Sequence, residues 1–309
     1  MPTYTNLNGI TGPSQQTLLP QLKTNVAEFF NWGLLGRGFF AQISGNISGA
    51  YGGNYAQLRL VNDPNYTLGQ VWEGSRINWV WETGVENGYS PTIPSGVYVN
   101  STFYPATGTG TYAHNISYPL GRVVFNTAIS TTGIVKCFHS EKRFQIGTED
   151  QPWAKEIIFN TYRVDQASGT QILGQNRVQM PSLIIGAVAN REQYGMAIGG
   201  GQWVDQDLYF LICAETPWDR DKLVDVVTYQ NDKTIRSYNT ETVAASGRYP
   251  LDLNGFRNSS GWVYPDLIRT FYHKTILFKD MRVSEILNQQ PFFKAIVRCK
   301  AHTEMPELS

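Results

Sequence analysis

Short β-forming runs separated by turn residues fill the chain from Phe39 to Ile146, and they constrain the fold more than any other feature. The runs are Leu58–Val61, Ile77–Trp81, Gly96–Val99, Tyr112–Ile116, Arg122–Phe125 and Gly133–Phe138. Glycine, asparagine, aspartate and proline lie between them, as is typical of turns. Strands that recur every 10–15 residues or so, without a helical pattern between them, predict a β-sandwich or barrel.

One segment before these strands has helical spacing. Its apolar residues stand at positions 18, 19, 22, 26, 29, 30 and 34, and Pro20 falls where the first helical turn tolerates it. The C-terminal end of this stripe is aromatic, with Phe29, Phe30 and Trp32. We expect this helix to dock either on its own domain or on a neighbouring subunit.

The second half of the chain mixes strand and helix patterns. Lys155–Tyr162 fits a strand or the start of a helix, and Thr216–Asp219 has the cap, proline and acid of a helix N-terminus. The helix that follows is expected to bury Trp218, Leu223, Val226 and Val227. Strands are expected at Asp207–Ala214, Ile276–Phe278 and Ala295–Cys299, with an apolar run at Pro181–Val188 and a short helix at Val283–Leu287.

Charge is distributed unevenly over the 309 residues. Residues 1–130 carry five basic and five acidic side chains, and the other 20 of each kind follow. Uncharged polar groups or a partner must therefore cover much of the first part. We predict a helical docking segment at 1–38, a β-sandwich-like domain at 39–150 and an α+β domain at 151–309. The fold class is mainly β with an α+β C-terminal half, in which one or two helices pack on a sheet.

Net charge and apolar runs exclude several classes of protein. With 25 basic and 25 acidic side chains, the chain lacks the basic excess of a free nucleic-acid binder. No apolar run approaches the roughly 18 residues of a membrane span, and we expect no signal peptide and no membrane partner. Cys137, Cys213 and Cys299 lie inside apolar runs and are expected to be buried free thiols in a reducing compartment.

Catalytic and cofactor motifs are missing from the sequence. It has no phosphate-binding loop, zinc-protease helix, nucleophile elbow or Cys-x-x-Cys pair. Four pairs of reactive residue types have structural explanations instead: Cys137 with His139, Cys299 with His302, Asp205 with Asp207, and Asp219 with Asp221. We therefore expect no enzyme activity, no cofactor and no metal.

Two groups of side chains are candidates for binding. Trp72, Trp79 and Trp81 surround one predicted hairpin, where they fit a core, a subunit interface or a sugar-stacking platform. A mild basic excess lies in 268–302, and it fits either a solvated face or the lining of a DNA channel. The candidate channel residues are Lys274, Lys279, Arg282, Lys294, Arg298 and Lys300.

Several segments resemble parts of tailed-bacteriophage virion proteins. Ser95–Asn100, Tyr118–Phe125 and Gly133–Phe138 are similar to a small β module that presents a strand, a Gly-Arg-Val-x-Phe hairpin and a returning strand. Asp219–Asp225, after an apolar strand, is similar to a helix of phage neck and tail-completion proteins. The resemblance covers roughly residues 95–230.

This resemblance implies a virion component of the neck or head–tail connector. Such a protein is assembled in the host cytoplasm, forms a ring with copies of itself, touches other neck, portal or tail proteins, and lies near DNA without gripping it. The neutral, β-rich composition and the missing catalytic motifs favour the same class. A carbohydrate-binding adhesin of the tail or baseplate is the alternative, and it depends on Trp79 and Trp81.

Overall fold

The computed structural model describes most of the chain as two compact units. The described residues are 17–43, 56–82, 84–85, 90–106, 108–159, 162–164, 171–173, 178–196, 201–288 and 292–305. The large-sheet unit comprises Met1–Asn31, Gln145–Ser246 and Tyr264–Ser309, and the small-sheet unit comprises Trp32–Phe144 and Gly247–Val263. This division departs from the predicted ranges 1–38, 39–150 and 151–309 in three places, one of which is that 145–150 belongs to the large-sheet unit. The first helix belongs mostly to the large-sheet unit, and 247–263 joins the β module.

The small-sheet unit consists of short antiparallel strands around one core. Its four-stranded sheet has the order β2 (Arg59–Leu60), β3 (Val71–Glu73), β7 (Arg122–Phe125), β6 (His114–Ser117). A three-stranded sheet has the order β5 (Thr102–Pro105), β4 (Gly96–Val99), β8 (Val135–Lys136), and β1 (Phe40–Ile43) pairs with β9 (His139–Lys142). Buried residues from the first two sheets share one core, which includes Trp72, Val97 and Phe125. The predicted mainly β fold is confirmed.

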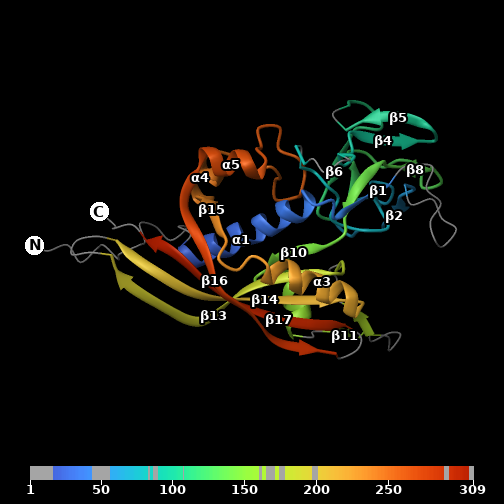
Figure 1. Cartoon of the computed structure of the whole chain (residues 1–309). Helices are drawn as coiled ribbons and strands as arrows, with labels where there is room; N and C mark the ends of the chain where they lie inside the picture. The colour runs from blue at the N-terminus through green and yellow to red at the C-terminus, as the bar shows by residue number, and fades with distance from the viewer. Residues whose placement is uncertain are drawn as a thin grey trace, which may run out of the picture. The chain divides into compact units, whose positions relative to one another are not determined.

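The large-sheet unit is built on six strands, four of them long (Figure 1). Their order is β10 (Gln145–Thr148), β13 (Ser182–Gly195), β14 (Gln202–Ala214), β17 (Phe293–Met305), β16 (Tyr272–Leu287), β15 (Thr234–Tyr238). β10 runs parallel to β13, and every other pair is antiparallel. A separate hairpin joins β11 (Tyr162–Val164) and β12 (Gln171–Leu173).

Helices cover both faces of the large sheet. The helices are α1 (Leu18–Leu35), α2 (Pro152–Phe159), α3 (Pro217–Thr228), α4 (Thr240–Ala245) and α5 (Tyr264–Thr270). Phe30 of α1 meets Phe210 of β14 at 5.5 Å between ring centroids, whereas Leu211 packs with Ile157 of α2. Successive strand residues point to opposite faces, so α1 and α2 lie on opposite sides of β14. No helix among the described residues has the length and apolar character needed to cross a membrane.

Three sequence expectations are settled by these elements. The predicted helix at Val283–Leu287 is wrong, because β16 continues through it to Leu287. Lys155–Tyr162, which fitted either element, forms most of α2 up to Phe159. The α3 start is confirmed, with the Thr216 side chain accepting from the Asp219 N–H, but Trp218 is 75% exposed rather than buried.

Gly186 of β13 lies where a side chain has no room, and this gives a stability test. A methyl group there would overlap the Tyr209 ring and the Glu149 carboxylate. We expect Gly186→Ala to lower the free energy of unfolding by about 2 kcal/mol, as overpacking does in a close-packed interior. Gly195→Ala, in the same strand with no atom within 4 Å of the new group, is the control. Urea unfolding of both variants measures the difference, and equal effects would contradict the assigned packing.

Candidate assembly surface

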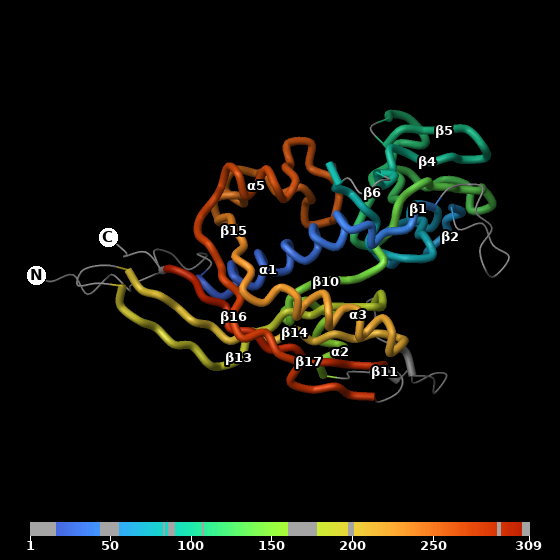
Figure 2. The backbone as a smooth tube through the Cα atoms, viewed as in Figure 1, coloured from blue at the N-terminus to red at the C-terminus, as the bar shows by residue number. Residues whose placement is uncertain are grey.

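The β13–β14 hairpin forms an arm whose outer strand is exposed. β10 pairs with β13 only over Ser182–Ile185, and the last seven residues of β13, Ala189–Gly195, are all exposed. Within the described part of the chain, no strand pairs with β13 on that side beyond Ile185. Figure 2 shows the hairpin running out past the helices as a curved arm. We call the outer side of Ala189–Gly195 the arm edge.

Backbone hydrogen-bonding groups alternate in direction along this arm. The Met196 N–H donates to the Gly201 carbonyl at 2.9 Å, across the hairpin. In an antiparallel pair, inward and outward groups alternate residue by residue. The backbone N–H and C=O groups of Glu192 and Tyr194 therefore point toward β14. Those of Arg191, Gln193 and Gly195 point outward along the arm edge. Such a row of unpaired groups is a template for another strand.

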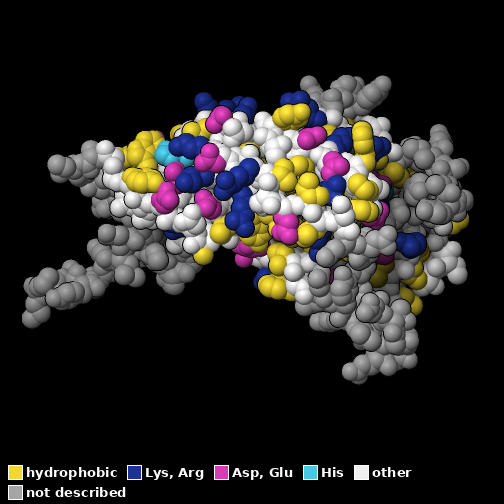
Figure 3. Space-filling view, turned by 60° about the horizontal axis from the view of Figure 1, so that its bottom comes forward, with side chains coloured by type: hydrophobic (Ala, Val, Ile, Leu, Met, Phe, Trp, Pro, Cys, Tyr) yellow, Lys and Arg dark blue, Asp and Glu magenta, His cyan; other side chains and the backbone are white. Residues whose placement is uncertain are grey.

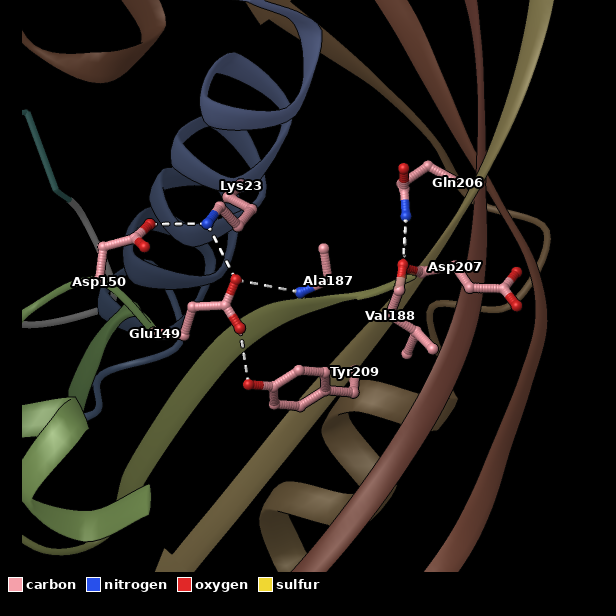
Figure 4. A network of polar contacts seen from close by, with 8 residues as sticks. All are labelled: Lys23, Glu149, Asp150, Ala187, Val188, Gln206, Asp207 and Tyr209. Atoms are coloured by element: carbon pink, nitrogen blue, oxygen red, sulfur yellow. Dashed lines mark hydrogen bonds and ion pairs between the residues drawn. The ribbon is translucent and has the colours of Figure 1, made fainter. Parts of the chain in front are cut away.

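A bulge at the root of the arm redirects β13. The register with β14 shifts between Ala187 and Arg191, so β13 has more residues than its partner there. Gln206, only 3% exposed, fills the bulge. Its Nε2 donates to the carbonyls of Val188 at 2.9 Å and Asn190 at 3.1 Å (Figure 4 shows the first). These bonds satisfy carbonyls that the ladder leaves unpaired, and bulges of this kind increase local twist.

The carboxylate of Glu149 joins four segments just before the bulge (Figure 4). It accepts from Lys23 Nζ at 3.0 Å, from the Tyr209 hydroxyl at 2.7 Å and from the Ala187 N–H at 3.4 Å. Lys23 also pairs with Asp150 at 2.6 Å. Burial lowers the pKa of Lys23, but its bonds to Asp150 and Glu149 outweigh burial and leave the pKa raised. Burial and Glu149 both raise the pKa of the Tyr209 hydroxyl, which stays a donor.

A second unpaired edge lies on the opposite side of the same sheet. β15 pairs with β16 only between Tyr272 and Leu277. Residues 231–233 make hydrogen bonds to Phe278 and Met281, the next part of β16. From Arg282 to Leu287, no described segment pairs with the outer side of β16, which we call the β16 edge. Val283 and Ile286 on it are 40% and 51% exposed.

Five of the six candidate channel residues share one face of the large sheet, but acids are interspersed among them. Lys279 lies opposite Lys300, and Arg282 opposite Arg298. Lys294 lies on the same face of β17 as Arg298, by strand alternation. On the next strands this face carries Asp205, Asp207 and Glu192, and the Glu192 carboxylate lies 3.5 Å from Lys300. Figure 3 likewise shows cations and acids side by side rather than one extended basic patch.

The sixth cation, Lys274, lies elsewhere. It lines a small cavity with Leu18, Leu22 and Ile276, on the α1 side of the sheet. Burial lowers the pKa of its ammonium group. The six residues therefore do not form one lining, which corrects the grouping that the sequence suggested.

Most of the candidate aromatic residues lie in hydrophobic cores. Phe30, Trp72 and Trp79 are 3%, 3% and 0% exposed, so their rings are not available to a ligand or a partner. Phe29 packs on Phe278 within the large-sheet unit, with ring centroids 6.0 Å apart. This agrees with docking of the helix on its own domain. Trp32 and Trp81 are half-buried, and Lys142 Nζ lies 5.6 Å from the Trp81 ring.

The paired reactive residues make structural contacts. His139 Nδ1 bonds the Cys137 carbonyl at 3.0 Å rather than its thiol, and burial raises the pKa of that thiol. Cys299 is buried, whereas His302 contacts Asp205 on the other face of β17. Asp219 belongs to the α3 cap, and Asp221 pairs with Arg220. The described residues contain no cluster of histidine, cysteine, aspartate and glutamate that could hold a metal ion.

A groove of about 360 Å³ in the small-sheet unit was not anticipated from the sequence. Leu120 and Tyr66 line one part of it, and Leu253 and Phe256 come from the returning segment 247–263. Arg122, also in its wall, is held by Asp63 at 3.1 Å and Glu73 at 3.4 Å. Its cation is therefore already paired.

Comparison with protein-family models and with curated proteins finds no match for this chain. The function is therefore inferred from the fold and from the surfaces described above.

His139 gives a pH test of the small-sheet core. Its ring is fully buried and stacked on Trp79 at 4.0 Å, and burial lowers its pKa from 6.5 to about 4. Between these two pH values the unfolded chain binds more protons, so acid favours unfolding. A lowering of this size corresponds to about 3 kcal/mol of stability, which is present above pH 6.5 and lost by about pH 4.

The measurement is urea unfolding between pH 7.5 and 4, followed by tryptophan fluorescence. His139→Phe keeps a ring against Trp79 but cannot take up a proton, so its stability should fall less over this range. A variant with the same pH dependence as the unchanged protein would contradict this assignment.

Proposed function

We propose that this chain is a non-enzymatic structural protein that works by assembly, as a ring component of a tailed-phage neck or head–tail connector. The observation that carries the proposal is the arm, where seven consecutive strand residues are exposed and the outer side has no strand partner among the described residues. An open strand edge of this length invites pairing with another chain. The partners would be copies of this chain and neighbouring virion proteins.

The absence of a catalytic arrangement among the described residues supports the same class. Each reactive pair that the sequence offered makes a structural contact instead, and the three cysteines are buried free thiols. The mixed face of the large sheet is compatible with a ring through which DNA passes. One of its cations, Lys300, lies beside the Glu192 carboxylate and opposite Asp207, and acids placed in this way weaken the attraction of the face to phosphates.

The adhesin alternative has less support. It depended on Trp79 and Trp81 presenting a pair of rings to a sugar. Trp79 is fully buried and stacked on His139, so the two rings do not form an exposed platform. No other observation favours glycan binding over assembly.

The test is the mass of the purified full chain in solution, measured by light scattering over a range of concentrations, with negative-stain images of the same sample. We expect closed oligomers with a central hole, because a repeated head-to-tail contact closes into a ring when the rotation between copies permits it. A monomer at every concentration would count against the proposal.

A further inference from the structure

We propose that the arm edge of one copy pairs with the β16 edge of the next copy, so that one continuous antiparallel sheet crosses the subunit boundary. This inference rests on the proposed function and specifies its contact. A second copy of this chain thus binds the arm edge. It binds by strand addition, through backbone hydrogen bonds, rather than by docking of side chains.

The polarity of the sheet permits this continuation. β13 is antiparallel to β14, β14 to β17, and β17 to β16, so β13 and β16 run in opposite directions. When a second copy is placed beside the first in the same orientation, its β16 is antiparallel to β13. The new pair then repeats the pattern of the existing ladder.

Outward backbone groups are present on both edges. The backbone N–H and C=O groups of Gln193 point outward, and the pairings of β13 with β14, β14 with β17 and β17 with β16 extend the same alternation to β16. By this alternation, the backbone groups of Glu285 and Leu287 point toward β17. Those of Val283 and Ile286 then face the β16 edge. Each edge therefore supplies donors and acceptors that have no partner among the described residues.

The two edges are similar in length, and each carries one cation and one acid. The arm edge has seven residues with Arg191 and Glu192, and the β16 edge has six with Arg282 and Glu285. An antiparallel register that sets Glu192 opposite Arg282 brings one pair of opposite charges together, beside the contact that Glu192 already makes with Lys300. The same contact would remove apolar surface of Tyr194, which is 49% exposed, and of the exposed Val283 and Ile286 from water.

Two different edges also explain a closed assembly. The contact is heterologous, so each copy keeps one edge free for the next copy, and only closure of a ring satisfies all edges. Pairing of two arm edges with each other would instead stop at a dimer.

Hydrogen exchange on the unchanged full chain is the first test. Samples are compared at concentrations above and below assembly. We expect amide exchange in 189–195 and 282–287 to slow at least about tenfold on assembly, because the outward N–H groups become bonded. Unchanged exchange in both segments of an assembled sample overturns the inference.

Two proline variants test the pairing directly. Gln193→Pro removes an outward N–H from the arm edge, and Ile286→Pro removes one from the β16 edge, while the ladder bonds inside each copy are retained. Gln193→Ala and Ile286→Val keep the N–H groups and are the matched controls. We expect each proline variant alone to be monomeric and both controls to assemble.

Mixing the two proline variants distinguishes the possible contacts. Each retains one intact edge, so an equimolar mixture should give a dimer with twice the monomer mass and nothing larger. Assembly of Ile286→Pro alone, or a mixture that stays monomeric, overturns the inference. If both proline variants form the same rings as the unchanged chain, this contact is wrong but the proposed function stands. If the unchanged chain itself never assembles, the proposed function fails.

Discussion

The Glu149 carboxylate is the interaction on which the arrangement of the large-sheet unit depends. It follows β10 directly, and its bonds to Lys23, Ala187 and Tyr209 tie together α1, β13 and β14. A carboxylate that is only 25% exposed would be costly without the buried ammonium of Lys23 beside it. Gly186 is required by the same contact, because the Tyr209 ring must lie across the strand to reach Glu149. The parallel pairing of β10 thus ends where this network begins, and β13 continues into the arm paired with β14 only, among the described strands.

Local patterns in the sequence predicted the elements that depend on local chemistry. The α3 cap is set by Thr216 and Asp219, and the short strands of the small-sheet unit follow from alternation and turn residues. The prediction of a helix at Val283–Leu287 was wrong. Apolar residues there have helical spacing, but this segment pairs with β17 through backbone hydrogen bonds that residue spacing does not reveal. The return of 247–263 to the small-sheet unit depends on contacts with residues more than a hundred positions away, such as Ser117 with Asn254.

The candidate site residues could be predicted only in part, for the same reason. Aromatic residues are typical of cores and of interfaces alike, so the sequence could not separate buried Trp79 from half-buried Trp81. The basic segment looked uniform because its acidic neighbours come from other strands, and Glu192 lies 108 positions from Lys300. The arm edge had no sequence signal of its own, since its exposure follows from the early end of β10 and from the bulge around Gln206.

Edge strands of proteins that act as monomers are usually protected by charged side chains, above all lysine, by proline, by bulges or by very short length. Neither Ala189–Gly195 nor Arg282–Leu287 contains a lysine or a proline, and neither run is short. Bulges can turn an edge away from a partner, and β16 has shifts in register beside Arg282 and Val283. The five residues from Arg191 to Gly195, however, pair with β14 without any further shift in register, so the backbone groups along their outer side alternate regularly. A long strand edge without lysine or proline favours aggregation of an isolated molecule, and assembly removes this risk by covering the edge. The same feature that would promote aggregation in a monomer is therefore what a ring-forming protein requires.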